Sequence, residues 1–202
     1  IAASDMTGDD RWADFSHGFF RAWGARRHPW GEDDNTAPGH AMCTIVERTG
    51  DQALREAVLD LARSFQGRRR VGPVSITFED TLRSLRMPYG GVPLSPDQLA
   101  LMRDPGAGIW LDCMHFDPPL FAHLDRIDPD QGWGEAAEAE ILGYRDLLLD
   151  EGTGLYRHYW LERTGESYIR GWGRGQGWAL LGLIDVAEFR PEAAEVAAEA
   201  LR

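Results

Sequence analysis

The chain has 202 residues, of which 43% are hydrophobic and 27% charged, a balance typical of one globular domain with a substantial core. Its formal net charge of −12 excludes a protein that binds nucleic acid through a basic surface. No apolar run approaches the roughly 20 residues that cross a bilayer, so we expect no membrane partner.

The absence of lysine and the small number of cysteines narrow the range of possible reactions further. All 21 basic residues are arginine, which excludes Schiff-base chemistry and a phosphate-binding loop lysine. Two cysteines, Cys43 and Cys113, are too few for a disulfide framework, and we expect both to be buried. The N-terminus lacks a basic segment followed by an apolar one, so we expect no signal peptide and a cytoplasmic location.

The first predicted helix covers residues 11–27, where aromatic side chains recur at spacings of three, four and seven. Such spacings place them on one face of a helix, which we expect to be apolar throughout. A polar segment that contains proline and glycine follows the helix. The aromatic residues of this face are Trp12, Phe15, Phe19, Phe20 and Trp23.

A pair of helices is predicted next, over residues 40–49 and 52–65. Gly50 ends the first helix, and Asp51 is placed to cap the second. The second helix has apolar residues at helical spacing. These residues are Leu54, Val58, Leu61 and Phe65.

Residues 67–108 contain five prolines and form the least helical part of the chain, although "VSITF" is a candidate short strand. A helix is predicted to restart in "GIWLDCMHFDPPLFAHLDRI" and to bend at its two prolines. Further helices are predicted over residues 133–150, in the apolar run after Trp178, and over residues 190–202. The fold class that follows is all-α, an array or toroid of helical hairpins with short β pieces in the loops.

Asp112 is the first candidate for chemistry, because it stands in the apolar segment "GIWLDCMHF". An acid in such a segment is costly unless it is paired or neutral, and a neutral aspartic acid can serve as a general acid. The alternative is structural, with Asp112 as a helix cap. Both interpretations stay open on the sequence alone.

Two further candidates have equally plain structural alternatives. Asp34 and its neighbour Asp33 precede a helix, where aspartate is a common cap. His158 lies in "GLYRHYW", where a histidine packs among aromatic rings as readily as it reacts. Cys113, His115 and Asp117 alternate along a predicted helix, which would spread them around its circumference, so we expect no metal site there.

The segment "GWGRGQGW" places Trp172, Arg174 and Trp178 among four glycines at the start of a helix. Indole faces stack on sugar rings, and a guanidinium pairs with a carboxylate through two parallel hydrogen bonds. Glycines allow a close approach of the backbone, and the helix N-terminus adds positive potential. The alternative is a glycine-rich loop that serves only for tight helix packing.

Taken together, these motifs resemble the unsaturated rhamnogalacturonyl hydrolases, a family in the glycosyl hydrolase 88/105 superfamily that is close to the unsaturated glucuronyl hydrolases. The resemblance rests on "WLD" at 110–112, "GLYRHYW" at 154–160, "GWGRGQGW" at 171–178 and "DDNTAPGHAM" upstream. It extends from about residue 10 to residue 189, nearly the whole chain. The implied fold is an α/α toroid of six helical hairpins, incomplete here and truncated at both ends of a single domain, residues 1–202.

The resemblance also implies an activity, the removal of a 4,5-unsaturated uronic acid from the non-reducing end of oligosaccharides made by polysaccharide lyases. The reaction hydrates the vinyl ether of the sugar and needs neither metal nor organic cofactor. Asp112 matches the general acid/base, and Asp34 matches the acidic residue that holds the unsaturated ring. The residues that match the substrate pocket are His158, Trp172, Arg174 and Trp178.

Two rival functions remain. A truncated hairpin toroid is also consistent with a carbohydrate-binding or scaffold module that has no turnover. Another enzyme of the same fold, such as a sugar epimerase, would be expected to use pairs of histidines, which the sequence does not make evident.

Overall fold

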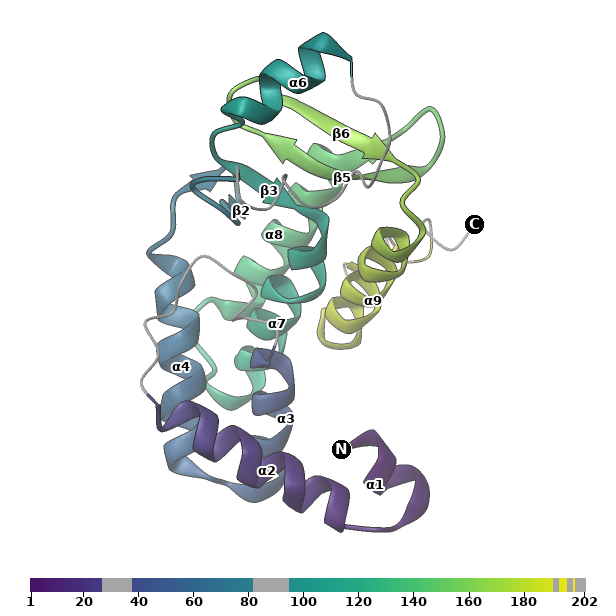
Figure 1. Cartoon of the computed structure of the whole chain (residues 1–202). Helices are drawn as coiled ribbons and strands as arrows, with labels where there is room; N and C mark the ends of the chain where they lie inside the picture. Colours follow the sequence, from purple (N-terminus) through teal and green to yellow (C-terminus); the bar gives the residue numbers. More distant parts are fainter. Residues whose placement is uncertain (27–37, 82–94, 191–192, 196–197, 199–202) are drawn as a thin grey trace.

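A computed structural model describes residues 1–26, 38–81 and 95–190, together with a few positions beyond Pro191. Helices form most of it, as predicted, and a small antiparallel sheet covers one end of the helical layer (Figure 1). The helices are α1 (Ala2–Thr7), α2 (Arg11–Gly24), α3 (Gly39–Thr49), α4 (Gln52–Gln66), α6 (Pro96–Arg103), α7 (Asp117–Ile127), α8 (Trp133–Leu148) and α9 (Gly173–Phe189). No helix in the described part of the chain is long and apolar enough to span a membrane.

The strands are short. They are β1 (Arg70–Val71), β2 (Val74–Ser75), β3 (Gly108–Trp110), β4 (Leu149–Asp150), β5 (Leu155–Leu161) and β6 (Glu166–Arg170). Strand β5 is the centre of the four-stranded sheet, because β3, β4 and β6 all pair with it in antiparallel register. The predicted strand in "VSITF" is realised in part, since β2 covers only its first two residues and Phe78 forms an isolated bridge to Gly108.

Two hairpins show why the sequence folds into antiparallel helices. Gly50 takes the left-handed conformation, with φ 68°, and ends α3. The Asp51 side chain then accepts hydrogen bonds from the backbone N–H groups of Ala53 and Leu54, so it caps α4 as predicted. The second hairpin joins α7 to α8 through Gly132, whose φ is 76°.

The core lies between the helices of these hairpins. It continues beneath the sheet, where Trp160 and Ile109 are buried. Both cysteines are buried and free, as expected. The largest side chains with less than 2% exposure are Tyr144, Phe65, Phe121, Met42, Leu54 and Leu61.

Three predictions for the central segment need correction. The segment at 108–127 does not form one bent helix, because β3 is followed by a 3₁₀ helix, η1 (Leu111–His115), and then by α7. Pro118 and Pro119 stand in the first turn of α7, where a missing N–H costs nothing, so they start the helix and do not bend it. Helix α6 also interrupts the stretch that was predicted to be irregular.

The aromatic face predicted for α2 is divided in the structure. Phe20 and Trp23 pack against the core. Trp12, Phe15 and Phe19 are 54%, 72% and 54% exposed. Spacing alone places side chains on a face, but what covers that face depends on neighbouring helices. The helix predicted over 190–202 lies mostly outside the described residues.

Candidate functional site

The candidate site is assembled from three elements at the junction of the sheet and the helices. Asp112 lies in the first turn of η1, directly after β3, and His158 lies in β5, which pairs with β3. Trp172 is the N-cap residue of α9, and Arg174 lies in the first turn of that helix. Asp34 lies outside the described residues.

An acid and a histidine face each other at this junction. The Oδ2 atom of Asp112 is 3.5 Å from Nε2 of His158, and the side chains are 24% and 16% exposed. The same oxygen is buried and has no hydrogen-bond donor among the described residues. Asp112 is not in the middle of a long apolar helix, nor does it cap α7, so both expectations from the sequence are replaced by a position in the short η1 turn.

An aromatic ring and a guanidinium extend the pair toward solvent. The rings of His158 and Trp172 have centroids 4.1 Å apart with a tilt of 35°. The guanidinium carbon of Arg174 lies 4.4 Å from the centre of the Trp172 ring. Among the described residues, no carboxylate forms an ion pair with Arg174.

Trp178 lies one turn further along α9 and joins the group through the end of η1. Its ring stacks on His115, with centroids 5.2 Å apart and planes 17° apart. Its indole Nε1 is buried and lacks a hydrogen-bond acceptor among the described residues. The structure thus brings together Asp112, His158, Trp172 and Arg174, and places Trp178 beside them against His115.

Two glycines of "GWGRGQGW" have identifiable structural roles. Gly171 has φ 76°, which turns the chain from β6 into α9. A Cβ atom on Gly175 would lie 2.5 Å from Trp172 and 2.9 Å from Leu111, so the absent side chain lets α9 approach η1. Gly173 and Gly177 have open space around them. The close approach of α9 to the segment that carries Asp112 therefore depends on Gly175.

Sequence reasoning missed the sheet and the residue that ties it to α9. The aromatic residues of "LYRHYWL", which favour strands, followed by a Thr-Gly turn, were the available signal for the hairpin of β5 and β6. Gln176 accepts a hydrogen bond from the Tyr156 backbone N–H at 2.8 Å and donates one to the Tyr156 carbonyl at 2.8 Å. This side chain fixes the start of α9 against the strand that carries His158.

Replacing Gln176 with leucine should lower the melting temperature, because it leaves the N–H and C=O of Tyr156 without these partners. An unsatisfied buried group costs about 1–3 kcal/mol, and each 1 kcal/mol corresponds to about 2–4 °C for a chain of this size. Gln176→Glu keeps the acceptor and loses the donor, so we expect an intermediate melting temperature. Equal melting curves for all three proteins would show that the amide contributes nothing to the junction.

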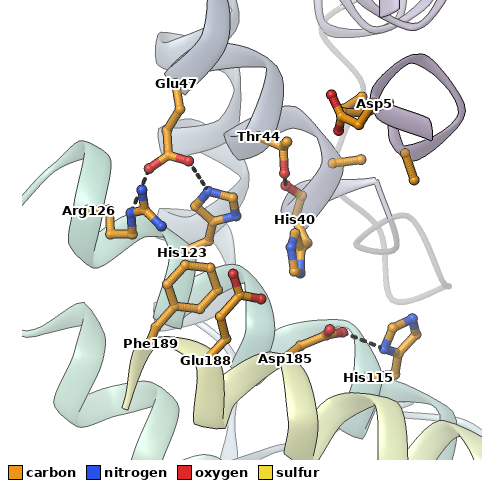
Figure 2. Close-up of a pocket in the computed structure, with 13 residues that line it drawn as sticks. Asp5, His40, Thr44, Glu47, His115, His123, Arg126, Asp185, Glu188 and Phe189 are labelled. Atoms are coloured by element: carbon orange, nitrogen blue, oxygen red, sulfur yellow. Dashed lines mark hydrogen bonds and ion pairs between the residues drawn. The ribbon is translucent and has the colours of Figure 1, made fainter. Parts of the chain in front are cut away.

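A second group of titratable residues lines the concave face of the helical layer, in a cavity of about 530 Å³ (Figure 2). The cavity is bounded by residues of α1, α3, α7 and α9 and by His115 of η1. His123 contacts Glu47 at 2.8 Å, and the ring of His40 meets the ring of His123 edge to face at 4.9 Å. His115 reaches Asp185 at 3.2 Å. Among the described residues no group of histidine, cysteine and acidic side chains has the arrangement of a metal site.

The free energy of unfolding should fall as the pH is lowered from 7.5 to 5.5, because two histidines are buried in this cavity. Burial lowers the pKa of His40, as does the nearby His123, and burial also lowers the pKa of His123 against the opposing effect of Glu47. A histidine with a lowered pKa is neutral when folded, so its contribution is complete above its unfolded pKa of about 6.5 and is lost as the pH falls toward the folded value.

The measurement is the melting temperature as a function of pH. The variant His40→Gln should show a weaker dependence on pH, because only His123 then remains to take up a proton at the His40–His123 contact. A parent protein whose melting temperature does not change from pH 7.5 to pH 5.5 would contradict the prediction. Carboxylates titrate mainly below this window, so they contribute little to the slope.

The layered helical hairpins around a concave face, with loops and a small sheet at one rim, define the described chain as part of an α/α toroid. Residues 103–200 match the family model for Glycosyl Hydrolase Family 88. This match confirms the family-level resemblance drawn from the sequence.

Solved structures of that fold resemble the chain over 98% of its length. A glycoside hydrolase of family 105 from C. acetobutylicum ATCC 824 has a TM-score of 0.72 at 17% identity, with 55% of its own chain covered. The unsaturated glucuronyl hydrolase of Bacillus sp. GL1 has a TM-score of 0.63 at 19% identity, with 52% covered. The enzyme of the same name from Streptococcus agalactiae gives 0.67 at 14%, with 49% covered.

This likeness establishes the fold, and the chain spans about half the length of these structures. No match was found among the curated proteins.

Proposed function

We propose that this chain carries the acid and the uronate pocket of a glycoside hydrolase that removes 4,5-unsaturated uronic acids from oligosaccharides. The observation that supports it best is the convergence of Asp112, His158, Trp172 and Arg174, which combines an acid, an aromatic ring and a guanidinium in one place. The family match and the unsaturated glucuronyl hydrolases among the structural neighbours are consistent with this substrate class.

Each side chain has a separate role in the proposal. The indole of Trp172 lines the sugar pocket and supports the guanidinium of Arg174, which pairs with the uronate carboxylate. The His158 ring adjoins both Asp112 and Trp172, so it holds the acid beside the bound ring. Asp34 is proposed to hold the unsaturated ring as well, on the basis of the sequence resemblance alone, and Trp178 completes the pocket wall.

The proposed chemistry is an addition of water to the double bond, in which Asp112 acts twice. The carboxylic acid donates its proton to C4 of the C4=C5 bond, and positive charge develops at C5 and the ring oxygen. Water then attacks C5 while the Asp112 carboxylate takes a proton from it, which restores the acid. The product is a hemiketal at C5, which opens to a ketone at C5 and a hemiacetal at C1. Breakdown of this hemiacetal to the aldehyde releases the sugar that was linked at C1, as its alcohol.

This route leaves the anomeric carbon without a nucleophile, so the distance between two carboxylates does not report on stereochemistry as it does in retaining and inverting glycosidases. It also predicts a convenient signal. The C4=C5 bond conjugated with the carboxylate absorbs in the ultraviolet, and hydration removes that absorbance. The decisive experiment is therefore to follow absorbance when the chain is incubated with unsaturated glucuronyl and galacturonyl disaccharides.

Loss of absorbance would support the hydrolase, and a folded protein that leaves both substrates unchanged would contradict it. A carbohydrate-binding module is the second candidate, favoured by one observation, that an indole and a guanidinium lie together at the site. That module would bind the disaccharides in calorimetry without consuming them.

A further inference from the structure

Two arginines face each other on the pair of strands that leads to the candidate site. Arg157 in β5 lies directly opposite Arg170 in β6 in the antiparallel register. Like charges at directly opposed positions repel each other and destabilise the pairing of the strands. Arg157 immediately precedes His158, and Arg170 immediately precedes the turn from β6 into α9, which begins at Trp172 (Figure 1). The repulsion therefore acts where the site is assembled.

One carboxylate pairs with both arginines. The Oδ2 atom of Asp150, in β4, is 2.5 Å from Nη2 of Arg157 and 2.7 Å from Nη2 of Arg170. The Asp150 side chain is 10% exposed. Its partial burial raises the pKa of the carboxyl, but Arg170 and Arg157 outweigh this effect and hold that pKa below its ordinary value. Asp150 is therefore charged at neutral pH and offsets the repulsion between the two arginines.

Asp150 lies behind the site and not inside it. Side chains alternate between the two faces of a strand, so Arg157 and His158 point to opposite faces of β5. Tyr156 and Trp160 belong to the main core beneath the sheet, so His158 shares the face that is turned toward the helices. Asp150 pairs with Arg157 on the other face. Any influence of Asp150 on the site is therefore transmitted through the strands.

The turn from β6 into α9 contains a strained residue beside this ion pair. Ile169 has φ 56°, a conformation that a β-branched residue rarely adopts, and the register of β5 and β6 places it opposite His158. Such strain persists only where the surrounding structure fixes the chain. The pairing of β6 with β5 fixes the chain before Ile169, and the contact of Arg170 with Asp150 fixes it afterwards.

We propose that Asp150 is a positioning residue of the candidate site, whose carboxylate neutralises the two opposed arginines and thereby keeps His158 against Trp172. The rings of His158 and Trp172 are 4.1 Å apart, and they meet only while β5 stays paired with the end of β6. Without the carboxylate, Arg157 and Arg170 repel each other, and the end of β6 moves away with the start of α9. An effect of Asp150 on turnover rests on the proposed function, whereas its effect on the ring contact does not.

The ring contact can be followed without substrate by NMR of the protein with isotope-labelled histidine. The chain has six histidines, and His158→Gln assigns the signal of His158. The ring current of the indole shifts this signal, and Trp172→Leu gives its position without the indole. Asp150→Asn should move the His158 signal most of the way to that position. If the proposed function holds, the same variant should lower kcat by about tenfold.

A second substitution distinguishes neutralisation from a simple tether. Arg170→Gln leaves Asp150 paired with Arg157 and can still donate a hydrogen bond to it, so the His158 signal should stay at the parent position. The double variant Asp150→Asn/Arg170→Gln removes the repulsion together with the carboxylate, so the signal should return close to that of the parent. Added sodium chloride should move the signal of Asp150→Asn in the same direction, because salt screens the repulsion.

Asp104→Asn is the matched control. Asp104 pairs with Arg163 at 2.5 Å, at the turn that joins β5 to β6, so this variant also removes an ion pair of the hairpin. It leaves the opposed arginines neutralised, and we expect the His158 signal and the turnover of the parent.

The proposal is overturned if folded Asp150→Asn keeps the parent signal, or if Arg170→Gln loses the ring contact as fully as Asp150→Asn does. Should Asp150→Asn fail to fold, Arg170→Gln and the double variant decide, because both should fold and keep the contact. Loss of the contact or of the fold in either of them overturns the proposal. Signals that shift as expected in a protein without turnover would contradict the proposed function alone.

Discussion

Asp112→Asn should abolish the turnover of an unsaturated uronyl disaccharide and leave the melting temperature unchanged. Asparagine keeps the shape of the side chain but cannot donate a proton to C4 and recover one from water. General acid/base catalysis contributes about 10²- to 10⁴-fold, so a loss of that size is expected in the initial rate of absorbance decrease. The variant should still bind the disaccharide, because Trp172 and Arg174 remain in place.

The structure gives two reasons why the substitution should be tolerated by the fold. The Asp112 Oδ2 atom accepts no hydrogen bond among the described residues, and its contact with His158 is a distant 3.5 Å. Asp60→Asn is a suitable control, because Asp60 is an exposed carboxylate on α4, far along the chain from the site. Activity of Asp112→Asn within about tenfold of the parent, with an equal melt, would remove this residue from the acid role.

Gly182→Ala should destabilise the protein severely and separate α9 from the site. A Cβ atom at this position would lie 2.2 Å from the backbone carbonyl oxygen of Met114 and 3.3 Å from the Cα of His115. The obstacle is backbone of η1, so it cannot be avoided by a side-chain rotation, and α9 or η1 has to move. Inserting atoms into a packed interface costs about 1–3 kcal/mol or more, which corresponds to about 2–4 °C for each kcal/mol.

Gly177→Ala provides a control within the same helix. A Cβ atom at Gly177 meets nothing within 4 Å, and alanine favours a helix more than glycine does, so this variant should melt at a slightly higher temperature than the parent, by about 0.4–1 kcal/mol of stability. Opposite shifts from the two substitutions would establish that close packing on η1, and not helix propensity, sets the position of α9. If both variants melt alike, the tight contact at Gly182 does not exist in solution.

The positions of the helices could largely be predicted from the sequence, because the signals are local. The Gly50 stop, the Asp51 cap and the apolar spacing of α4 all depend on residues within a few positions of each other. The same holds for α8 and for the part of α9 after Trp178, where apolar residues recur at helical spacing. The sheet was harder, since β3 and β5 are separated by some 45 residues and pair only in the folded chain.

The residue types of the candidate site could be predicted from the sequence. The roles of the individual residues stay predictions. The aromatic, basic and acidic residues of the motifs indicated sugar chemistry, but no local pattern gives the 3.5 Å approach of Asp112 to His158, 46 positions apart. Gln176 was not recognised, because a glutamine that hydrogen-bonds a strand backbone leaves no signature in sequence. The contact of His40 with His123 was also missed, because it joins two helices that are far apart in the sequence.

By itself, the sequence determined the all-helical class, the hairpin order and the chemical character of the loops, because caps, glycine stops and apolar periods act over one or two turns. Only the tertiary structure decided which apolar faces are covered. Phe20 and Trp23 are packed, whereas Phe15 and Phe19 on the same helix are exposed. It also decided that Gly175 and Gly182 let α9 reach η1, since burial and close approach depend on segments far apart in the chain.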